Sequence, residues 1–162
     1  MIGFYEVEKE EDLALLGEMK LELMRYHLSF AEKLGIADYE LLNYTKEQAL
    51  STSSQRTSIL FYCENELIGM SQVQEQVSEV DNCPILFIYS IYIKPSVQNQ
   101  GVGNQFLHYL ANKYRKRIEC ECWYDMPSKG FYKHVGFRPM MTRYILPTTS
   151  SYYGSDQNCI SE

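Results

Sequence analysis

Hydrophobic residues form several short runs along the chain that are continuous or alternate with polar residues, a pattern typical of β-strands. Polar turns and prolines separate these runs: Glu64-Asn65-Glu66 lies between two of them, and Pro95 follows another. The run 85–93 is apolar on both faces, as expected for a strand in the centre of a sheet. We predict strands over residues 2–8, 57–63, 67–77, 85–93, 117–124 and 137–146.

A different spacing, of three and four residues, follows the first predicted strand and indicates a helix. Acidic residues at 10–12 open this helix, where they interact favourably with the positive end of the helix dipole, and Gly35 ends it. Its buried face is predicted to comprise Leu16, Met19, Leu23, His27, Phe30 and Leu34.

Three more helices complete the predicted order of elements. One begins near Asp38 or at Thr45, and the others cover residues 101–114 and 128–135. The order β-α-α-β-β-β-α-β-α-β predicts an α+β fold with a mixed, largely antiparallel central sheet flanked by helices.

The size of the chain, 162 residues, is that of one domain. We assign this domain to residues 1–146 and expect the polar residues 147–162 to form a flexible tail. The net charge of −6 argues against a nucleic-acid-binding protein. No apolar run reaches the roughly 20 residues that a membrane-spanning helix needs.

The cysteines give no sign of a disulfide framework or a metal site. There are five, an odd number at irregular spacing, which favours reduced thiols. Cys120 and Cys122 face the same side of a predicted strand, but no further ligands at matching spacing accompany them. No secretory signal pattern opens the chain, so we expect a cytoplasmic protein.

Charge is divided unevenly between the two halves of the chain. Residues 1–82 hold 16 acidic and 6 basic residues, a net charge of −10, whereas residues 83–162 hold 5 acidic and 9 basic residues, a net charge of +4. This asymmetry is compatible with a cationic ligand at the first half and an anionic ligand at the second. Solvated acidic helices and a basic helix end would also explain it.

The segment 91–103 runs from the central strand through a short loop into a helix. Gly101 and Gly103 remove side chains where the loop becomes a helix, so backbone amides can converge on one point. Such a helix start favours an anion, most naturally a phosphate. The segment lacks the Lys-Ser or Lys-Thr of a Walker loop and the third glycine of a dinucleotide fingerprint, which weakens a nucleotide-binding interpretation.

Two motifs together resemble a known superfamily. The first is Gln-x-x-Gly-x-Gly, formed by Gln98, Gly101 and Gly103; the second is Gly-Phe-Tyr-Lys-His-Val-Gly-Phe at residues 130–137. In this order and separation they resemble the GCN5-related N-acetyltransferase (GNAT) superfamily. There the first motif binds the pyrophosphate of acetyl-CoA, and the second places a tyrosine on a short helix. The predicted element order over residues 2–146 also fits this fold.

The resemblance implies a role for each matching residue. The strand 85–93 would part from the strand 117–124 at a bulge, and the pantetheine arm of acetyl-CoA would pair with the backbone near Ile91 and Ile93. The amide of Ile93 or a neighbour would polarise the thioester carbonyl. Tyr132 would protonate the departing thiolate or, alternatively, only pack against the cofactor. The pyrophosphate would be bound by the amides of Gln98, Asn99, Gln100, Gly101, Val102, Gly103 and Asn104.

The general base that many members place on the bulged strand is missing here, because that strand has no carboxylate. Glu75 is the base that we select, with Glu79 as a neighbouring candidate and Glu22 on the first helix as a weaker one. Each of these is also compatible with a solvated surface carboxylate. A chain of water molecules would serve without a dedicated base.

We therefore expect an acetyl-CoA-dependent N-acetyltransferase in which a primary amine attacks the thioester directly in a ternary complex. The acidic first half of the chain favours a small cationic amine. The alternatives are a protein or peptide N-acetyltransferase and a non-catalytic acyl-CoA sensor. A homodimer is compatible with the superfamily, and the sequence does not identify the acceptor.

Overall fold

We describe a computed structural model of the chain over residues 1–31, 55–122 and 126–140. The predicted second helix and the tail lie outside these residues. The described elements follow one another as β1 (Ile2–Glu6), α1 (Glu10–Ala31), β2 (Thr57–Cys63), β3 (Glu66–Val77), β4 (Pro84–Ile93), a short 3₁₀ helix η3 (Pro95–Val97), α4 (Val102–Tyr114), β5 (Arg117–Cys120) and α5 (Ser128–His134).

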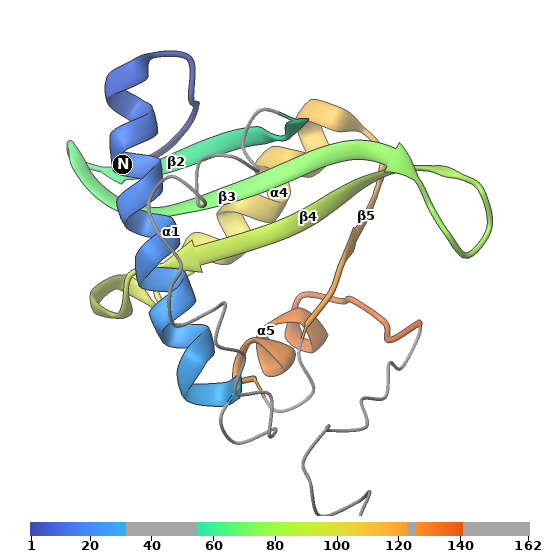
Figure 1. Ribbon diagram of the computed structural model, residues 1–162. Helices are drawn as coiled ribbons and strands as arrows, with labels where there is room; N and C mark the ends of the chain where they lie inside the picture. The colour runs from blue at the N-terminus through green and yellow to red at the C-terminus, as the bar shows by residue number, and fades with distance from the viewer. Residues whose placement is uncertain (32–54, 123–125, 141–162) are drawn as a thin grey trace, which may run out of the picture.

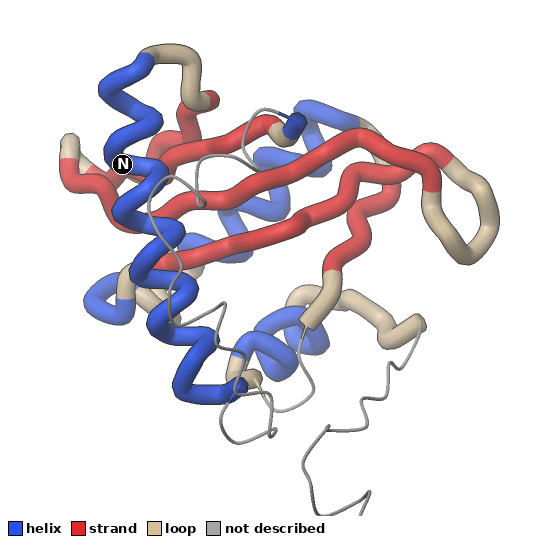
Figure 2. Tube along the Cα trace, in the orientation of Figure 1, coloured by secondary structure: helices blue, strands red, loops and turns tan. Residues whose placement is uncertain are grey.

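The described strands form one sheet in the order β1-β2-β3-β4-β5 (Figure 2). The pairs β1–β2, β2–β3 and β3–β4 are all antiparallel, and short turns join β2 to β3 and β3 to β4. β5 pairs with β4 in the parallel direction, because α4 carries the chain back across the sheet. The fold is therefore α+β with a mixed, largely antiparallel sheet, which confirms the predicted class.

Helices cover both faces of the sheet, α1 on one and α4 on the other (Figure 1). The α1 face buries a small cluster in which the predicted residues Leu16, Met19 and Leu23 contact Met70 and Tyr92. His27 is half-buried, whereas the side chain of Phe30 and all of Leu34 lie outside the described parts. The α4 face buries the larger cluster, formed by Ile59, Phe61, Ile68, Val73, Leu86, Ile88, Val102, Phe106, Leu107 and Leu110.

The central strands agree with the sequence prediction to within one residue at each end, but the ends of the chain differ from it. β1 ends at Glu6, and β5 ends at Cys120 rather than at residue 124. Residues 137–140, the described part of the predicted last strand, form no strand. The amide of Phe137 donates instead to the carbonyl of Tyr132, and Gly136 has a φ of 98°, so this segment closes the end of α5.

A β-bulge interrupts β4 at Tyr89. In the pairing with β3, Gln72 lies opposite Ser90 but Val73 lies opposite Ile88, so Tyr89 is an extra residue in β4. The bulge makes the backbone hydrogen bonding between β3 and β4 irregular. Next to it, the hydroxyl of the buried Ser71 donates to the carbonyl of Ser90 at 2.7 Å.

The extra residue also changes which side chains face which helix. Phe87 and Tyr89 have their rings 4.8 Å apart on the α1 face, and Tyr92 packs on that face as well. Ile88 and Ile91 both pack on the α4 face, three residues apart rather than two. Tyr89 and Ser90 therefore both face α1, because Ser90 lies against Met70 of the α1 cluster.

Candidate functional site

The bulge marks the point at which β4 and β5 separate. The parallel pairing runs from Ile85 opposite Arg117 to Ile88 opposite Cys120 and stops there. Beyond it, β5 leads away from β4 toward α5 (Figure 1). Over the described residues, β4 from Tyr89 to Ile93 therefore pairs with β3 on one side and with no strand on the side of β5. Backbone groups on that side, near Ile91 and Ile93, are open to an extended ligand.

The loop after β4 is held by its own side chains. The side-chain amide of Gln98 donates to the carbonyl of Ile93 at 2.8 Å, and that of Gln100 donates to the carbonyl of Ser96 at 3.2 Å. Asn99 and Gly101 have φ values of 62° and 80°, so the chain turns twice through the left-handed region before the helix. Alternation of this kind turns successive amides toward the same side.

The start of α4 is a helix N-terminus without a side-chain cap. Gly101 is the N-cap residue, and the first hydrogen bond of the helix runs from the amide of Gln105 to its carbonyl. The amides of Val102, Gly103 and Asn104 precede that bond and have no partner within the helix. Together with the helix dipole they form a site suited to an anion such as a phosphate.

Tyr132 is buried on α5, next in sequence to Phe131, whose ring lies against Gly103 at the start of α4. Tyr132 has 9% of its surface exposed and lies between the rings of Phe131 and Phe137 at 5.3 and 5.4 Å. Its hydroxyl is hydrogen-bonded with the thiol of Cys120. Burial raises the pKa of Tyr132 well above its ordinary value, and the neighbouring Cys120 and Cys122 raise it further. Tyr132 therefore keeps its proton at physiological pH.

Two cysteines of β5 and its continuation line the same region. Burial, together with the nearby Cys122, raises the pKa of the Cys120 thiol to about 12. Cys122 is exposed, and its sulfur lies 3.2 Å from the hydroxyl of Ser128 at the start of α5. The four cysteines of the described residues, Cys63, Cys83, Cys120 and Cys122, are all free thiols.

The three candidate bases lie in three different places. Glu75 lies opposite Leu86, at the closed end of the β4–β5 pair, and forms an ion pair with Lys116 after α4. Glu79 is exposed in the β3–β4 turn. Glu22 lies on the α1 face, where its carboxylate accepts a hydrogen bond from the hydroxyl of Tyr92 at 3.0 Å. Burial and this carboxylate raise the pKa of Tyr92 to about 12.

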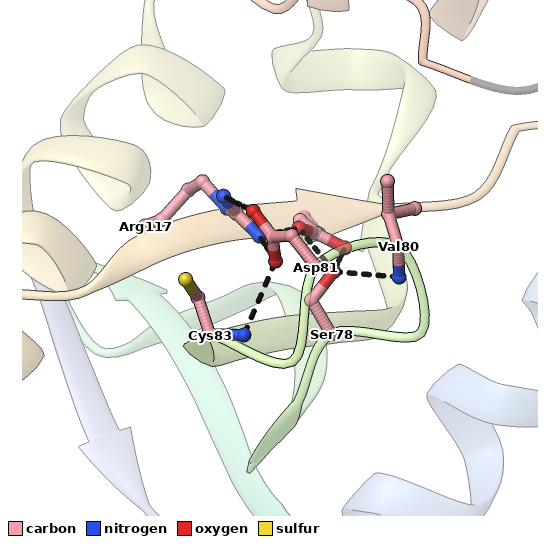
Figure 3. A network of polar contacts seen from close by, with 6 residues as sticks. Ser78, Val80, Asp81, Cys83 and Arg117 are labelled. Carbon is pink, nitrogen blue, oxygen red and sulfur yellow. Dashed lines mark hydrogen bonds and ion pairs between the residues drawn. The ribbon is translucent and has the colours of Figure 1, made fainter.

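A polar network holds the closed end of the β4–β5 pair (Figure 3). The guanidinium of Arg117, on β5, contacts both carboxylate oxygens of Asp81 at 2.6 and 2.7 Å and Glu119 at 2.7 Å. The Ser78 hydroxyl donates to Glu119 at 3.0 Å, and the amide of Cys83 donates to Asp81 at 3.1 Å. Hydrogen bonds from Arg117 and from this amide hold the pKa of Asp81 well below its ordinary value.

Other basic residues near the end of α4 are paired within the protein. Lys113 contacts Glu6 of β1, and Lys116 contacts Glu75 of β3. Lys113 and Lys116, at the basic end of the helix, thus pair with carboxylates of the protein itself. Both lie at the opposite end of α4 from the glycine loop.

The sequence did not single out the polar residues that line the α1 face beside the bulge. Arg56, just before β2, lies over the ring of Tyr89, with its guanidinium carbon 3.6 Å from the ring centre. Lys20 of α1 is buried near Arg56, and burial, with a smaller contribution from this positive charge, lowers the pKa of Lys20 to about 8. The order of the strands and the packing of α1 on the sheet bring these residues together from distant parts of the chain. No local sequence pattern could therefore have identified them.

Comparison with known proteins agrees with this arrangement. The family model described as an acetyltransferase (GNAT) domain matches residues 54–139, from just before β2 to the segment after α5. The chain belongs to the GNAT acetyltransferase family. In this GNAT protein the matched region contains the split between β4 and β5, the glycine loop and Tyr132.

Solved structures share the fold at low sequence identity. A protein of Pyrococcus furiosus assigned as an acetyl transferase aligns with a TM-score of 0.72 at 19% identity, over 91% of this chain and 99% of its own. An integron cassette protein of V. cholerae gives 0.64 at 21% identity, over 94% and 95%. An aminoglycoside N-acetyltransferase in complex with CoA gives 0.64 at 13% identity, over 90% and 93%.

No curated protein shows significant sequence similarity to the chain. Within the described residues, no helix combines the length and apolar character that crossing a membrane would need. The same residues contain no group of three or more His, Cys, Asp or Glu side chains arranged to hold a metal ion.

Proposed function

We propose that this GNAT protein is an acetyl-CoA-dependent N-acetyltransferase that acetylates a primary amine by direct attack in a ternary complex. The proposal is supported by three features that neighbouring contacts connect. These are the open edge of β4, the uncapped amides at the start of α4, and a protonated tyrosine on α5. Tyr132 is hydrogen-bonded with Cys120, the last β5 residue paired with β4, and the adjacent Phe131 lies against Gly103 of α4. Family membership supports acetyl transfer as the chemistry.

Acetyl-CoA, as co-substrate, would supply the acetyl group as a thioester. The chain would bind its pyrophosphate with the amides of residues 98–104, which the left-handed turns at Asn99 and Gly101 direct to one side. The pantetheine arm would extend the sheet along β4 near Ile91 and Ile93. An amide at Ile93 or its neighbour would polarise the thioester carbonyl.

Tyr132 is the proposed general acid. Its raised pKa makes it a poor acid toward water but keeps the proton in place until a thiolate forms beside it. The low polarity of its surroundings would strengthen its attraction to a developing negative charge. Its hydrogen bond with Cys120 holds the hydroxyl at the last β5 residue that pairs with β4, where the split begins.

The base remains a proposal with more than one candidate. Glu75 would have to leave its ion pair with Lys116 before it could accept a proton. Glu22 lies on the same face as the bulge residues Tyr89 and Ser90 and reaches the strand through Tyr92. A cationic amine must lose a proton before it can attack the thioester. In this arrangement the proton would pass from the amine through water to Glu22.

The acceptor is proposed to be a small amine rather than a protein. The excess of acidic residues in the first half of the chain supports an amine that is cationic before it reacts. A protein or peptide amine would share the same chemistry. A panel of acceptors would separate them by kcat/KM.

Calorimetric titration of the purified protein with acetyl-CoA tests this proposal, with ATP and NAD as controls. Saturable binding of acetyl-CoA, without binding of ATP or NAD, supports the assignment of the amides of residues 98–104. Release of free thiol on addition of amines supports turnover. Failure of a folded protein to bind acetyl-CoA would overturn the cofactor assignment. Binding without thiol release for any amine would replace the enzyme with an acyl-CoA sensor.

A further inference from the structure

Arg56 is held in a defined position on the α1 face of the sheet. Its guanidinium lies over the ring of Tyr89, with the guanidinium carbon 3.6 Å from the ring centre, which is close for a cation–π contact. The ring is itself fixed, because the hydroxyl of Tyr89 donates to the side chain of Gln76 at 2.8 Å and its other edge contacts Phe87. Stacking of this kind removes much of the rotamer freedom of an arginine before any ligand binds.

The charge of Arg56 is not neutralised by a carboxylate within the described parts of the chain. Arg117 makes a useful contrast, since it contacts both Asp81 and Glu119. A guanidinium that stacks through its face leaves the N–H donors at its edge available for a planar, bidentate partner. The nearby Lys20 adds a second positive charge rather than a negative one.

Arg56 lies beside the proposed site of reaction but on the opposite face from α4. Its partner Tyr89 is the bulge residue, next to Ser90, at the point where β4 parts from β5. The glycine loop leads into α4, which covers the other face of the sheet. An anion at Arg56 therefore belongs to the molecule that approaches from the α1 side, and not to the phosphates at the glycine loop.

We propose that Arg56 is a specificity-determining residue that binds a carboxylate of the acceptor, so that the acceptor is an amine that also carries a carboxylate group. The inference rests on the proposed function and narrows its substrate class. The same face holds the carboxylate of Glu22 near Tyr92, which suits the positive end of such a zwitterion. A carboxylate matches the fork of an arginine in two parallel hydrogen bonds.

The test compares pairs of amines that differ only in the carboxylate. L-lysine is paired with cadaverine and L-phenylalanine with phenethylamine, and kcat/KM is measured for the wild type and for Arg56→Gln, Arg56→Lys and Arg25→Gln. Arg25 is an exposed residue of α1 and serves as the matched control. Thermal unfolding of each variant shows whether it is folded.

We expect the wild type to favour at least one carboxylated amine over its partner by about 10-fold or more, the size of a charge-assisted hydrogen-bonded pair. In Arg56→Gln the ratio of the two kcat/KM values falls by about 10- to 100-fold, and Arg56→Lys restores part of it, since lysine keeps the charge without the fork. Arg25→Gln leaves the ratio at the wild-type value.

Three outcomes would overturn the inference. The first is a wild-type preference for the amines without a carboxylate, and the second is an equal loss for both members of each pair in Arg56→Gln, which indicates a purely structural role. The third is a preference for phosphoethanolamine over ethanolamine that exceeds the carboxylate effect, which would make the anion a phosphate.

Failure of the proposed function has a different signature. No amine is then acetylated, although acetyl-CoA binds. In that case calorimetric titration of the acetyl-CoA-loaded protein with the same amine pairs still tests Arg56. Selective binding of the carboxylated amines that is lost in Arg56→Gln supports the site, and equal or absent binding of both members rejects it.

Discussion

The environment of Tyr132 illustrates how much a single residue depends on distant parts of the chain. The motif at residues 130–137 predicted this tyrosine and its short helix. Its partner Cys120 comes from β5, and the sequence pattern indicated only a reduced thiol there. The hydrogen bond between them is a product of tertiary packing, so no spacing along the chain could reveal it.

Replacement of Tyr132 by phenylalanine removes the hydroxyl and keeps the ring between Phe131 and Phe137. We expect kcat to fall by about 10²-fold, the lower end of what a general acid contributes, while the Kd for acetyl-CoA changes by less than about twofold. Thiol release and calorimetry measure the two quantities. Tyr5→Phe, at an exposed position on β1, is the control. An undiminished kcat would assign Tyr132 to packing alone.

At the scale of elements, the two glycines of the loop are required for different reasons. Gly101 has a φ of 80°, which favours glycine, and a Cβ there would meet open space. Gly103 is helical, and a Cβ there would lie 2.7 Å from the ring of Phe131. The first glycine therefore shapes the loop, and the second allows α5 to pack against the start of α4.

Gly103→Ala tests this contact between helices. The methyl group must displace Phe131, so we expect a loss of about 1–3 kcal/mol in the free energy of unfolding, the usual effect of overpacking, and weaker binding of acetyl-CoA. Denaturant titration and calorimetry provide the measurements. Gly130→Ala on α5, where a Cβ has no neighbour within 4 Å, is the matched control and should be neutral or stabilising. Equal effects of the two changes would contradict the packing argument.

The elements that the sequence predicted well are those whose pattern is set by burial. The strand 57–63 was predicted with its observed bounds, because its residues are buried on both faces. The overlong prediction for 117–124 failed for a different reason. β4 bulges at Tyr89, which leaves β5 without a partner beyond Cys120. β5 therefore ends where its pairing with β4 ends, and the local sequence does not show where that is.

The predictions for the candidate site divide in the same way. The glycine loop and the start of α4 could be predicted, because Gln98, Gly101 and Gly103 are close in sequence and act through backbone amides. The position of Glu75 could not, because its ion pair with Lys116 joins residues far apart in the chain. Its role as a base stays a prediction.

At the scale of the whole molecule, charges of the two halves of the chain meet across the sheet. Basic residues at and after the end of α4 contact acidic residues of the first half: Lys113 contacts Glu6, Lys116 contacts Glu75, and Arg117 contacts Asp81. The division into an acidic and a basic half is therefore not a division of the surface. The net charge of each half indicated the charge of a preferred ligand, but it could not show where on the surface those charges lie.

Arg117→Gln tests whether the network at the closed end of the sheet holds β5 in place. The change removes the contacts with Asp81 and Glu119, so we expect a lower Tm and faster hydrogen exchange at the β5 amides. High salt should reduce the difference in Tm between the wild type and the variant, because these groups are near the solvent. Arg25→Gln, at an exposed position on α1, is the control.

The same network predicts a pH dependence. The pKa of Asp81 is depressed in the folded chain relative to its ordinary value of 3.8, so the contact stabilises the fold fully above that value. The difference in Tm between the wild type and Arg117→Gln should shrink as the pH falls below about 3.8 and Asp81 becomes protonated. A difference that is constant across this range would mean that the carboxylate of Asp81 contributes nothing.

The bulge at Tyr89 is needed for the open edge of β4 but not for the packing of the sheet. Without Tyr89, Phe87, Ser90 and Tyr92 would fall on one face of β4, and Ile88, Ile91 and Ile93 would fall on the other, in strict alternation. A chain one residue shorter would thus satisfy both clusters with an unbroken strand. The insertion of a single amino acid, neutral to the pattern on either side of it, is enough to change a closed sheet into one with an opening.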